Sequence, residues 1–327
     1  MTSAKQALIG TAVVVAIAAV DNYIVIESEP SFENMTWLEP GTFLMGSDKG
    51  MPDESPTHEV SLSGFWIDKF EVSNADYAQF IAATDYITDS EKAGDSMVFE
   101  FPGEQPILNF NPLDWWDLVM HADWRHPQGL TDSIEDKSDH PVVQVSFADA
   151  LAYCDWLDKQ LPTEAQFEFA ARGGREGEIY SWGNQPLHRT EAVSNTWQGN
   201  SSAEQQRQDG YQTTSPVGSF PPNDYGLHDI TGNVWEWVSD WYHPEYYSMS
   251  SSADPTGVAE EQSIDPADPA IAKRSIRGGS FLCRDDYCSG FRVSARMPAK
   301  PSASANHTGF RCVKNTSWTE SVLSQLN

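Results

Sequence analysis

Regular hydrophobic periodicity is lost in the second half of the chain, and this loss limits the folds that the sequence can adopt. From position 180 to 312 the sequence is rich in Trp, Gly, Pro and Asn, with only short strand-like stretches such as NVWEWV and RSIRGGSFL. Backbone that lacks a ladder of hydrogen bonds needs another organiser, and aromatic side chains and bound cations are the two candidates. Residues 249–272, rich in Ser, Ala, Asp, Glu and Pro, are predicted to form a solvated surface insertion.

The first half of the chain carries clearer signals of helices and strands. Alternating apolar residues predict short antiparallel strands between positions 41 and 67. Apolar periodicity predicts a helix that begins at Ser73 or Asn74, and capping patterns predict two further helices, which begin at Ser146 and at Thr163. The second helix places Cys154 on its buried face. Because no linker or internal repeat interrupts the chain, we expect one mixed domain of the α+β class.

The composition predicts an acidic globular protein. A chain of 327 residues, 39% of them hydrophobic, can bury a substantial core. Its formal net charge of -28 would repel a phosphate backbone, and no cluster of Lys and Arg offers a local exception, so a nucleic-acid partner is excluded. The acidity is interpreted as a source of solubility, with recognition of basic segments or cations as the alternative.

The N-terminus carries an apolar run, ALIGTAVVVAIAAV, at residues 7–20. The run is shorter than the roughly 18 residues of a membrane span and has the length of the apolar part of a secretory signal. We therefore predict that residues 1–22 are a signal peptide or a short anchor, with a buried helix as the remaining alternative. The protein is expected to be exported, to a periplasm, the extracellular space or a secretory lumen, with membrane contact at most through residues 7–20.

Two of the four cysteines lie five positions apart in GGSFLCRDDYCSGFR, residues 278–292. The spacing of Cys283 and Cys288 differs from the C-x-x-C of redox pairs and zinc knuckles. A helix or a flat strand would turn the two thiols away from one another. Only irregular backbone can bring these sulfurs together, if they meet at all.

Several sequence motifs occur in the same order as in one enzyme family. They are FLMGS, DKFEVSNADYAQF, HPVVQVSFADALAYCDWLDKQLPTEAQFEFAARGG, YSWGN, NTWQG, YGLHDITGNVWEWVSDWY, RSIRGGSF and GFRC. From about Phe32 to Val313 the chain resembles the formylglycine-generating enzyme (sulfatase-modifying factor) family. The resemblance implies a single loop-rich α+β domain at residues 30–318, with little regular secondary structure and a fold related to C-type lectins. GDSMVFE, the pair Trp115-Trp116 and ADWRHPQG resemble the long-form members.

The resemblance also implies the chemistry of the cysteine pair. Active members carry two cysteines five apart after a G-G-S strand, which match Cys283 and Cys288, with Ser280 as a further active-site residue. Soft thiolate ligands select Cu(I), so the pair is predicted to hold copper. With O2 the enzyme would convert a sulfatase cysteine, through a thioaldehyde, to Cα-formylglycine. A bend at residues 285–287 would place Cys288 opposite Cys283 across the copper ion.

Other interpretations of the cysteines remain open. Cys283 and Cys288 could form a disulfide, for instance as a resting state, or be buried thiols, and all four cysteines could bind zinc. The resemblance implies instead that Cys154 and Cys312 form a disulfide that closes a long loop. A second disulfide of some relatives has no counterpart, because its positions are Ala171 and Val293.

Two structural Ca²⁺ sites are also implied by the resemblance. The first would use side-chain and carbonyl oxygens of Asn195, Thr196, Asp209 and Tyr211. The second would use Asp229, Gly232, Val234 and Glu236. Mixed carboxylate and carbonyl sets suit Ca²⁺. By themselves, Asn and Asp in loops are more often turn-formers. Relatives carry Asn where Asp229 stands.

The implied substrate is an extended sulfatase polypeptide, unfolded or nascent, that carries C-x-P-x-R. The predicted peptide contacts are Trp235, Asn233, Arg296, His307 and Arg284, with a core position as the alternative for Trp235. Arg284 replaces a His of the long-form enzymes and His307 replaces an Asn, so the peptide preference is expected to differ. The protein is expected to be a monomer.

Two rival functions share this fold. One is a catalytically silent module that binds sulfatases without oxidising them, and it is disfavoured because a pure binder has no need for both Cys283 and Cys288. The other is an iron oxygenase of the hercynine type. The sequence lacks the His-x3-His-x-Glu arrangement and the additional helical domain expected of that type.

Overall fold

The computed structural model describes residues 32, 34–100, 115–187, 193–197, 209–284 and 288–315. The predicted signal or anchor at residues 1–22 lies outside the described residues, and so does the predicted bend at 285–287. Among the helices of the described part, none combines the length and the apolar character that a membrane span requires.

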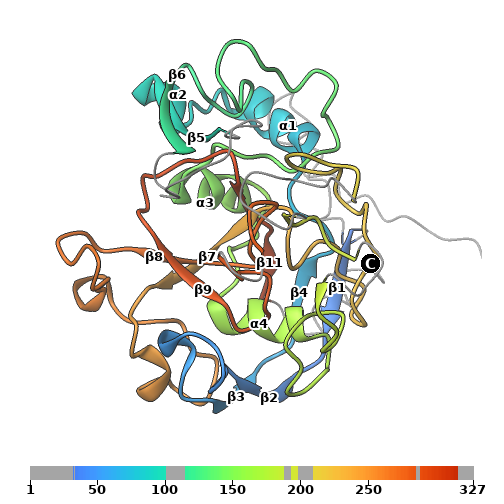
Figure 1. The fold of residues 1–327 in the computed structure, drawn as a ribbon, viewed down its shortest axis with the longest axis vertical. Helices are drawn as coiled ribbons and strands as arrows, with labels where there is room; N and C mark the ends of the chain where they lie inside the picture. Colours follow the sequence, from blue (N-terminus) through green and yellow to red (C-terminus); the bar gives the residue numbers. More distant parts are fainter. Residues whose placement is uncertain are drawn as a thin grey trace, which may run out of the picture.

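The strands of the described residues form small separate sheets (Figure 1). A four-stranded sheet has the order β10-β7-β8-β9, with the bounds Thr308–Gly309, Trp235–Trp241, Arg274–Arg277 and Arg296–Ala299. A three-stranded sheet has the order β1-β4-β11, with the bounds Met35–Leu38, Phe65–Asp68 and Val313–Lys314. Two hairpins pair β2 with β3, Gly41–Met45 and His58–Leu62, and β5 with β6, Asp95–Phe99 and Trp116–Met120.

The helices begin where local caps allow them to. The four α-helices are α1 Asn74–Thr84, α2 Asp89–Ala93, α3 Phe147–Trp156 and α4 Glu164–Arg172 among the described residues. Ser73, Ser146 and Thr163 each accept a hydrogen bond from a backbone N–H of the first turn, which confirms the three predicted helix starts. The capping box of α2, from Thr88 to Glu91, was not predicted. Within the described residues, short 3₁₀ turns include η1 Pro52–Glu54, η4 Tyr246–Ser248 and η5 Glu260–Gln262.

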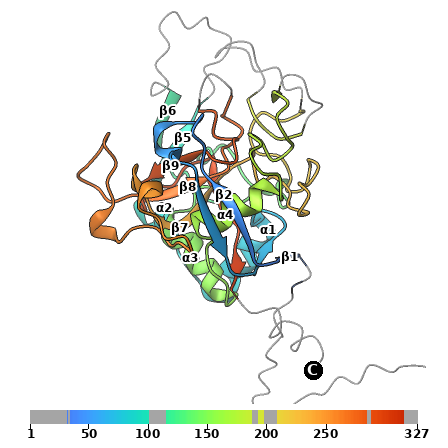
Figure 2. The ribbon, with the colours of Figure 1, turned by 90° about the horizontal axis from the view of Figure 1, so that it is seen from below.

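Helices α3 and α4 lie on opposite sides of the four-stranded sheet (Figure 1). Successive side chains of a strand point to opposite faces, so β7 serves both sides. Trp235 and Trp237 belong to the apolar cluster of α1 and α3, whereas Val238 belongs to the cluster of α4, β2, β3 and β4. The loops of 249–272, orange in Figures 1 and 2, project from one side and are largely exposed, as predicted. The result is a single loop-rich α+β domain.

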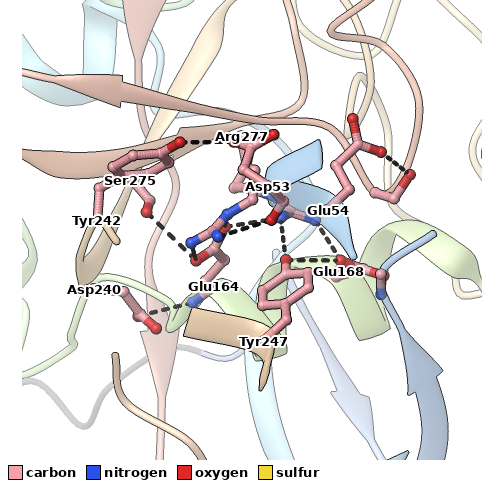
Figure 3. Close-up of polar contacts among 12 residues, drawn as sticks. Asp53, Glu54, Glu164, Glu168, Asp240, Tyr242, Tyr247, Ser275 and Arg277 are labelled. Atoms are coloured by element: carbon pink, nitrogen blue, oxygen red, sulfur yellow. Dashed lines mark hydrogen bonds and ion pairs between the residues drawn. The ribbon is translucent and has the colours of Figure 1, made fainter. Parts of the chain in front are cut away.

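A buried network of ion pairs joins α4 to β8 and β9 (Figure 3). Arg277 bonds to Glu164 at 2.9 Å and to Glu168 at 2.6 Å, and its side chain is fully buried. Arg296 bonds to both oxygens of Glu164 at 2.7 Å. Burial alone would raise the pKa of Glu164, but Arg296 and Arg277 outweigh it and hold the pKa below its usual value. The sequence indicated that aromatic side chains and bound cations could hold the irregular backbone in place. The structure adds buried ion pairs as a third kind of contact that does so.

The two positions at which the resemblance placed a second disulfide hold buried apolar residues. Ala171 and Val293 are both buried in the cluster around α4.

Candidate functional site

Glycines allow the two arms of the cysteine loop to approach one another. Gly278 and Gly279 follow β8 with φ angles of 89° and 75°, a region that favours glycine. A Cβ on Gly279 would lie 2.6 Å from the carbonyl carbon of Gly290. A Cβ on Gly290 would lie 2.4 Å from the ring of Trp235. The GGS word and Gly290 thus have a steric role, and they bring the segments of Cys283 and Cys288 side by side.

Cys283 and Cys288 are joined by a disulfide. Cys283 has no exposed surface, whereas Cys288 is exposed and has a φ angle of 76°. The N–H of Ser289 donates to the carbonyl of Arg284 at 3.1 Å, which closes the loop between the two sulfurs. The sulfurs therefore meet across irregular backbone. A disulfide between these two residues was one of the interpretations that the sequence allowed. Its presence excludes unpaired buried thiols in this state.

The backbone around Ser280 faces Cys283. The N–H of Ser280 donates to the sulfur of Cys283 at 3.4 Å, and the N–H of Cys283 donates to the carbonyl of Ser280 at 2.9 Å. The hydroxyl oxygen of Ser280 accepts from the N–H of Leu282 at 3.3 Å and is buried. A reduced Cys283 would thus face a backbone dipole that favours its thiolate.

An aromatic wall lies beside Cys283. Its buried members, taken from four separate segments, are Phe99, Trp115, Trp197, Phe281 and Leu282, with Trp116 packed against them. The rings of Trp115 and Trp197 are nearly parallel, with centroids 6.5 Å apart. The N–H of Trp197 donates to the carbonyl of Cys283 at 3.0 Å, which ties the wall to the cysteine loop. The sequence singles out the Trp115-Trp116 pair. It does not single out Phe99 or Trp197, although NTWQG was the available signal.

His307 continues this wall. Its half-buried ring lies 4.7 Å from that of Trp116, and its carbonyl accepts from the N–H of Trp235 at 2.9 Å. Burial lowers the pKa of His307 to about 3, so the ring is neutral at physiological pH. Arg284 is half-buried beside Cys288. These two predicted peptide contacts lie next to the cysteine pair or its wall.

Three other predicted peptide contacts have internal roles in this structure. Trp235 is 2% exposed and packs on Gly290, which confirms the alternative of a core position. Asn233 has no exposed surface, and its amide bonds to Glu71, Asn195 and Ser215. The guanidinium of Arg296 is enclosed and is bound by Glu164 and two backbone carbonyls. These side chains support the site from within, and a peptide could reach them only if these contacts broke.

The second predicted calcium set gathers around three buried carboxylates. Asp229 accepts from the N–H of Gly218 at 2.6 Å through one oxygen, and its other oxygen is buried without a hydrogen-bond partner among the described residues. Both oxygens of Glu236 bond to Arg311. The third carboxylate, Glu71, was missed by sequence reasoning, and the Glu of FEVSN gave no signal of burial. It accepts from the side-chain amide of Asn233 at 2.5 Å.

The electrostatics of this cluster favour an added cation. Burial raises the pKa of Glu71 well above its usual value, and the nearby carboxylates of Asp229 and Glu236 raise it further. Burial also raises the pKa of Asp229. Arg311 is the basic side chain that faces all three. No group of three His, Cys, Asp or Glu side chains in the described part is arranged as a ready metal cage. The open oxygen of Asp229 and the excess of carboxylates nevertheless fit a Ca²⁺ ion.

The first predicted calcium set is also brought together. The carboxylate of Asp209 accepts from the N–H groups of Tyr211 and Thr196. The carbonyl of Asn195 accepts from the N–H of Asn233 at 2.8 Å, so the two predicted sets are neighbours. Burial raises the pKa of Asp209. The second set offers the stronger case for a cation, because three carboxylates act on one another there.

The remaining two cysteines form a bridge of their own. Cys154 of α3 and Cys312 form a disulfide with an S–S distance of 2.00 Å, as the resemblance implied. Both residues are fully buried. Because all four cysteines are paired in two bridges, a zinc site built from the four is excluded in this structure.

Comparison with known proteins gives a consistent result. Residues 24–316 match the family described as the sulfatase-modifying factor enzyme 1-like domain. The formylglycine-generating enzyme of Thermomonospora curvata is 42% identical over 290 residues, which cover 86% of this chain and 93% of that protein. The inactive C-alpha-formylglycine-generating enzyme 2 of Bos taurus is 39% identical, with coverage of 85% and 87%. Among solved structures, PvdO from Pseudomonas aeruginosa superposes with a TM-score of 0.60 at 25% identity, over 86% of this chain and 94% of that one.

Proposed function

The protein belongs to the sulfatase-modifying factor family, and from that premise we propose that it oxidises the active-site cysteine of sulfatases to Cα-formylglycine. The observation that carries this proposal is the cysteine pair, with Cys283 buried beside an aromatic wall and Cys288 exposed. In the overall reaction, one substrate cysteine, O2, two electrons and two protons give an aldehyde, hydrogen sulfide and water. An external thiol supplies the electrons and becomes a disulfide.

The reduced pair is proposed to hold Cu(I), because two soft thiolates select cuprous copper. When bound, the ion supplies the chemistry with O2 that side chains cannot perform. The N–H of Ser280 stabilises negative charge on Cys283, and the glycine contacts hold the two arms in register. The disulfide is the oxidised form of the same pair, from which an external thiol would regenerate the two ligands.

The proposed substrate is an extended sulfatase segment that carries C-x-P-x-R, bound by a monomer. The aromatic wall lies beside Cys283, and the half-buried Trp116 and the neutral ring of His307 are its more accessible part. The net charge of -28 favours a substrate that carries arginine. The two disulfides agree with export to an oxidising compartment.

A silent sulfatase-binding module is the second candidate, because a relative of similar identity is named as inactive. It would use the same wall and would not need the thiols. Exposure of Cys288 opposite a buried Cys283 favours the oxidase, since a reactive sulfur at the surface serves chemistry rather than packing.

The decisive experiment is an oxidation assay. The purified protein, reduced and loaded with Cu(I), is incubated with a C-x-P-x-R peptide, O2 and a thiol, and aldehyde formation is followed by mass spectrometry. We expect conversion by the wild type and none by Cys283→Ser or Cys288→Ser. Failure of the wild type to convert the peptide, or equal conversion by Cys283→Ser, would reject the oxidase and leave the binding module.

Calcium is proposed as a structural cofactor at the two oxygen-rich sets, with Glu71 added to the second. A ligand that binds only the folded state raises the free energy of unfolding by about 2.7 kcal/mol at 100 times its Kd. Thermal unfolding with Ca²⁺ and with a chelator should therefore differ, and Asp229→Ala should reduce the difference more than Asp229→Asn. Identical unfolding curves with Ca²⁺ and chelator would remove calcium from the proposal.

A further inference from the structure

The chain leaves Cys288 in a backbone conformation that needs external support. Cys288 and Ser289 have φ angles of 76° and 37°, and neither is a glycine. Residues other than glycine rarely adopt these left-handed backbone angles. Where they do, contacts with the surrounding structure hold them in place. The question is which contact holds this arm of the loop.

Arg292 supplies that contact. Its Nε donates to the carbonyl of Ser289 at 3.2 Å, and its backbone N–H donates to the same oxygen at 3.4 Å. Its two terminal nitrogens bond to the two oxygens of Glu54 at 2.6 and 2.5 Å. One guanidinium thus binds a carboxylate on one side and the carbonyl next to Cys288 on the other.

Glu54 is itself held firmly. It is 1% exposed, and its carboxylate also accepts from the N–H of Met51 at 2.9 Å and the hydroxyl of Ser294 at 2.7 Å. The preceding carbonyl, of Asp53, accepts from Arg296 at 3.0 Å. Figure 3 places Asp53 and Glu54 beside the buried network of Arg277, Glu164 and Glu168. The contact to Ser289 is therefore anchored in the interior.

We propose that the Glu54–Arg292 pair is a positioning device for Cys288. Glu54 orients the guanidinium, the guanidinium fixes the carbonyl of Ser289, and the exposed sulfur is thereby kept opposite Cys283. Arg292 and Glu54 act through the backbone and are positioning residues. The consequence for catalysis rests on the proposed function, whereas the consequence for the thiol pair does not.

The test compares Arg292→Lys with Arg292→Met in the metal-free protein. Lysine keeps a positive charge near Glu54, but its single ammonium cannot bond to Glu54 and also replace the Nε contact with Ser289. The readout is the equilibrium in which two glutathione thiols become one glutathione disulfide while the Cys283–Cys288 bridge becomes two thiols. Alkylation and mass spectrometry of the peptides measure it, with Cys154–Cys312 intact.

We expect both variants to favour the dithiol about 10-fold more than the wild type does, because the two sulfurs meet less often. Arg175→Lys is the matched control, since Arg175 makes a similar two-bond pair with Asp224 on the surface, at 2.7 and 2.8 Å. Urea unfolding of each variant reports global stability. A wild-type equilibrium for Arg292→Lys, or shifts that simply follow global stability, would overturn the proposal.

Peptide oxidation by the same variants separates this inference from the proposed function. We expect kcat to fall about 10-fold for Arg292→Lys, with KM unchanged, because peptide contacts are retained. If the wild type does not oxidise peptide but the glutathione equilibrium shifts, the oxidase fails and the positioning role stands. If the wild type is active and Arg292→Lys changes neither kcat nor the equilibrium, the positioning role fails alone.

Discussion

The two disulfides of this protein occupy opposite settings. Cys154 and Cys312 are both fully buried, and their sequence separation is 158. Cys283 and Cys288 are separated by 5 positions, and one of them is exposed. Cys283 belongs to the same apolar cluster as Cys154 and Cys312, so three of the four sulfurs share one environment. The two bridges differ at Cys288. The first bridge joins two buried residues, whereas the second joins the buried Cys283 to an exposed residue.

The regions around the bridges differ in the same way. Between β8 and α4 the charged side chains are buried and paired, as in the contacts of Arg277 with Glu164 and Glu168. Around Cys288 the backbone adopts left-handed angles, and the guanidinium of Arg292 links the carbonyl of Ser289 to the buried Glu54. An interior with paired charges can hold nearby residues in a strained backbone conformation, and such residues cluster at functional sites.

Loss of the buried bridge should have the largest effect. In the chain-entropy model a bridge that closes a loop of more than 100 residues contributes about 5 kcal/mol to the free energy of unfolding. The double variant Cys154→Ala/Cys312→Ala should therefore lose most of that amount in urea unfolding, or fail to fold. A loss smaller than that of the matched Cys283→Ala/Cys288→Ala variant would break the comparison.

Removal of Arg277 should follow closely. Arg277→Met leaves two buried glutamates each without one partner, and loss of one member of a buried pair costs roughly 3 to 5 kcal/mol. Arg175→Met, at the exposed pair with Asp224, should cost about 1 kcal/mol or less. Urea unfolding at neutral pH measures both variants. Similar losses for the two would show that burial of the network contributes nothing.

Local signals were sufficient to predict part of this fold from the sequence. Helix starts at Ser146 and Thr163 were predictable because a cap needs only its own first turn, and the start at Ser73 was predictable from apolar periodicity. The cysteine pair stood out because its spacing suits no regular element. Its partner bridge, Cys154–Cys312, required the resemblance to a family.

Side-chain roles inside the site could not be predicted in the same way. Arg296 was expected at the peptide, yet its partner Glu164 lies 132 positions away in the sequence. Glu54 and Arg292 are 238 positions apart. Whether a charged residue contacts substrate or a buried partner depends on such distant pairings. Hydrophobic periodicity and motif spacing do not predict these long-range pairings.

Loss of the exposed bridge should have a smaller effect on stability. A loop as short as that between Cys283 and Cys288 contributes only about 2 kcal/mol in the chain-entropy model. Mild dithiothreitol should also reduce this bridge first, because a thiol can reach Cys288 and cannot reach Cys154 or Cys312. Alkylation and peptide mass spectrometry measure the order. Simultaneous reduction of both bridges in the folded protein would contradict the difference in access.

The smallest effect, taken over one pH unit, should come from the protonation of one carboxyl in the interior. Burial, with the carboxylate of Glu164 nearby, raises the pKa of Asp240 to about 7, whereas an unfolded chain titrates near 3.9. Between these values the folded protein holds a proton that the unfolded chain has lost, so its stability falls as pH rises through this window. From pH 6 to 7 the loss is about 1 kcal/mol, below the limit of about 1.4 kcal/mol per unit. Asp240→Asn keeps an acceptor for the N–H of Glu164 and should remove this slope, whereas Asp155→Asn, exposed on α3, should retain it. Parallel stability curves for wild type and Asp240→Asn between pH 5 and 8 would show that this part of the interior does not exclude water.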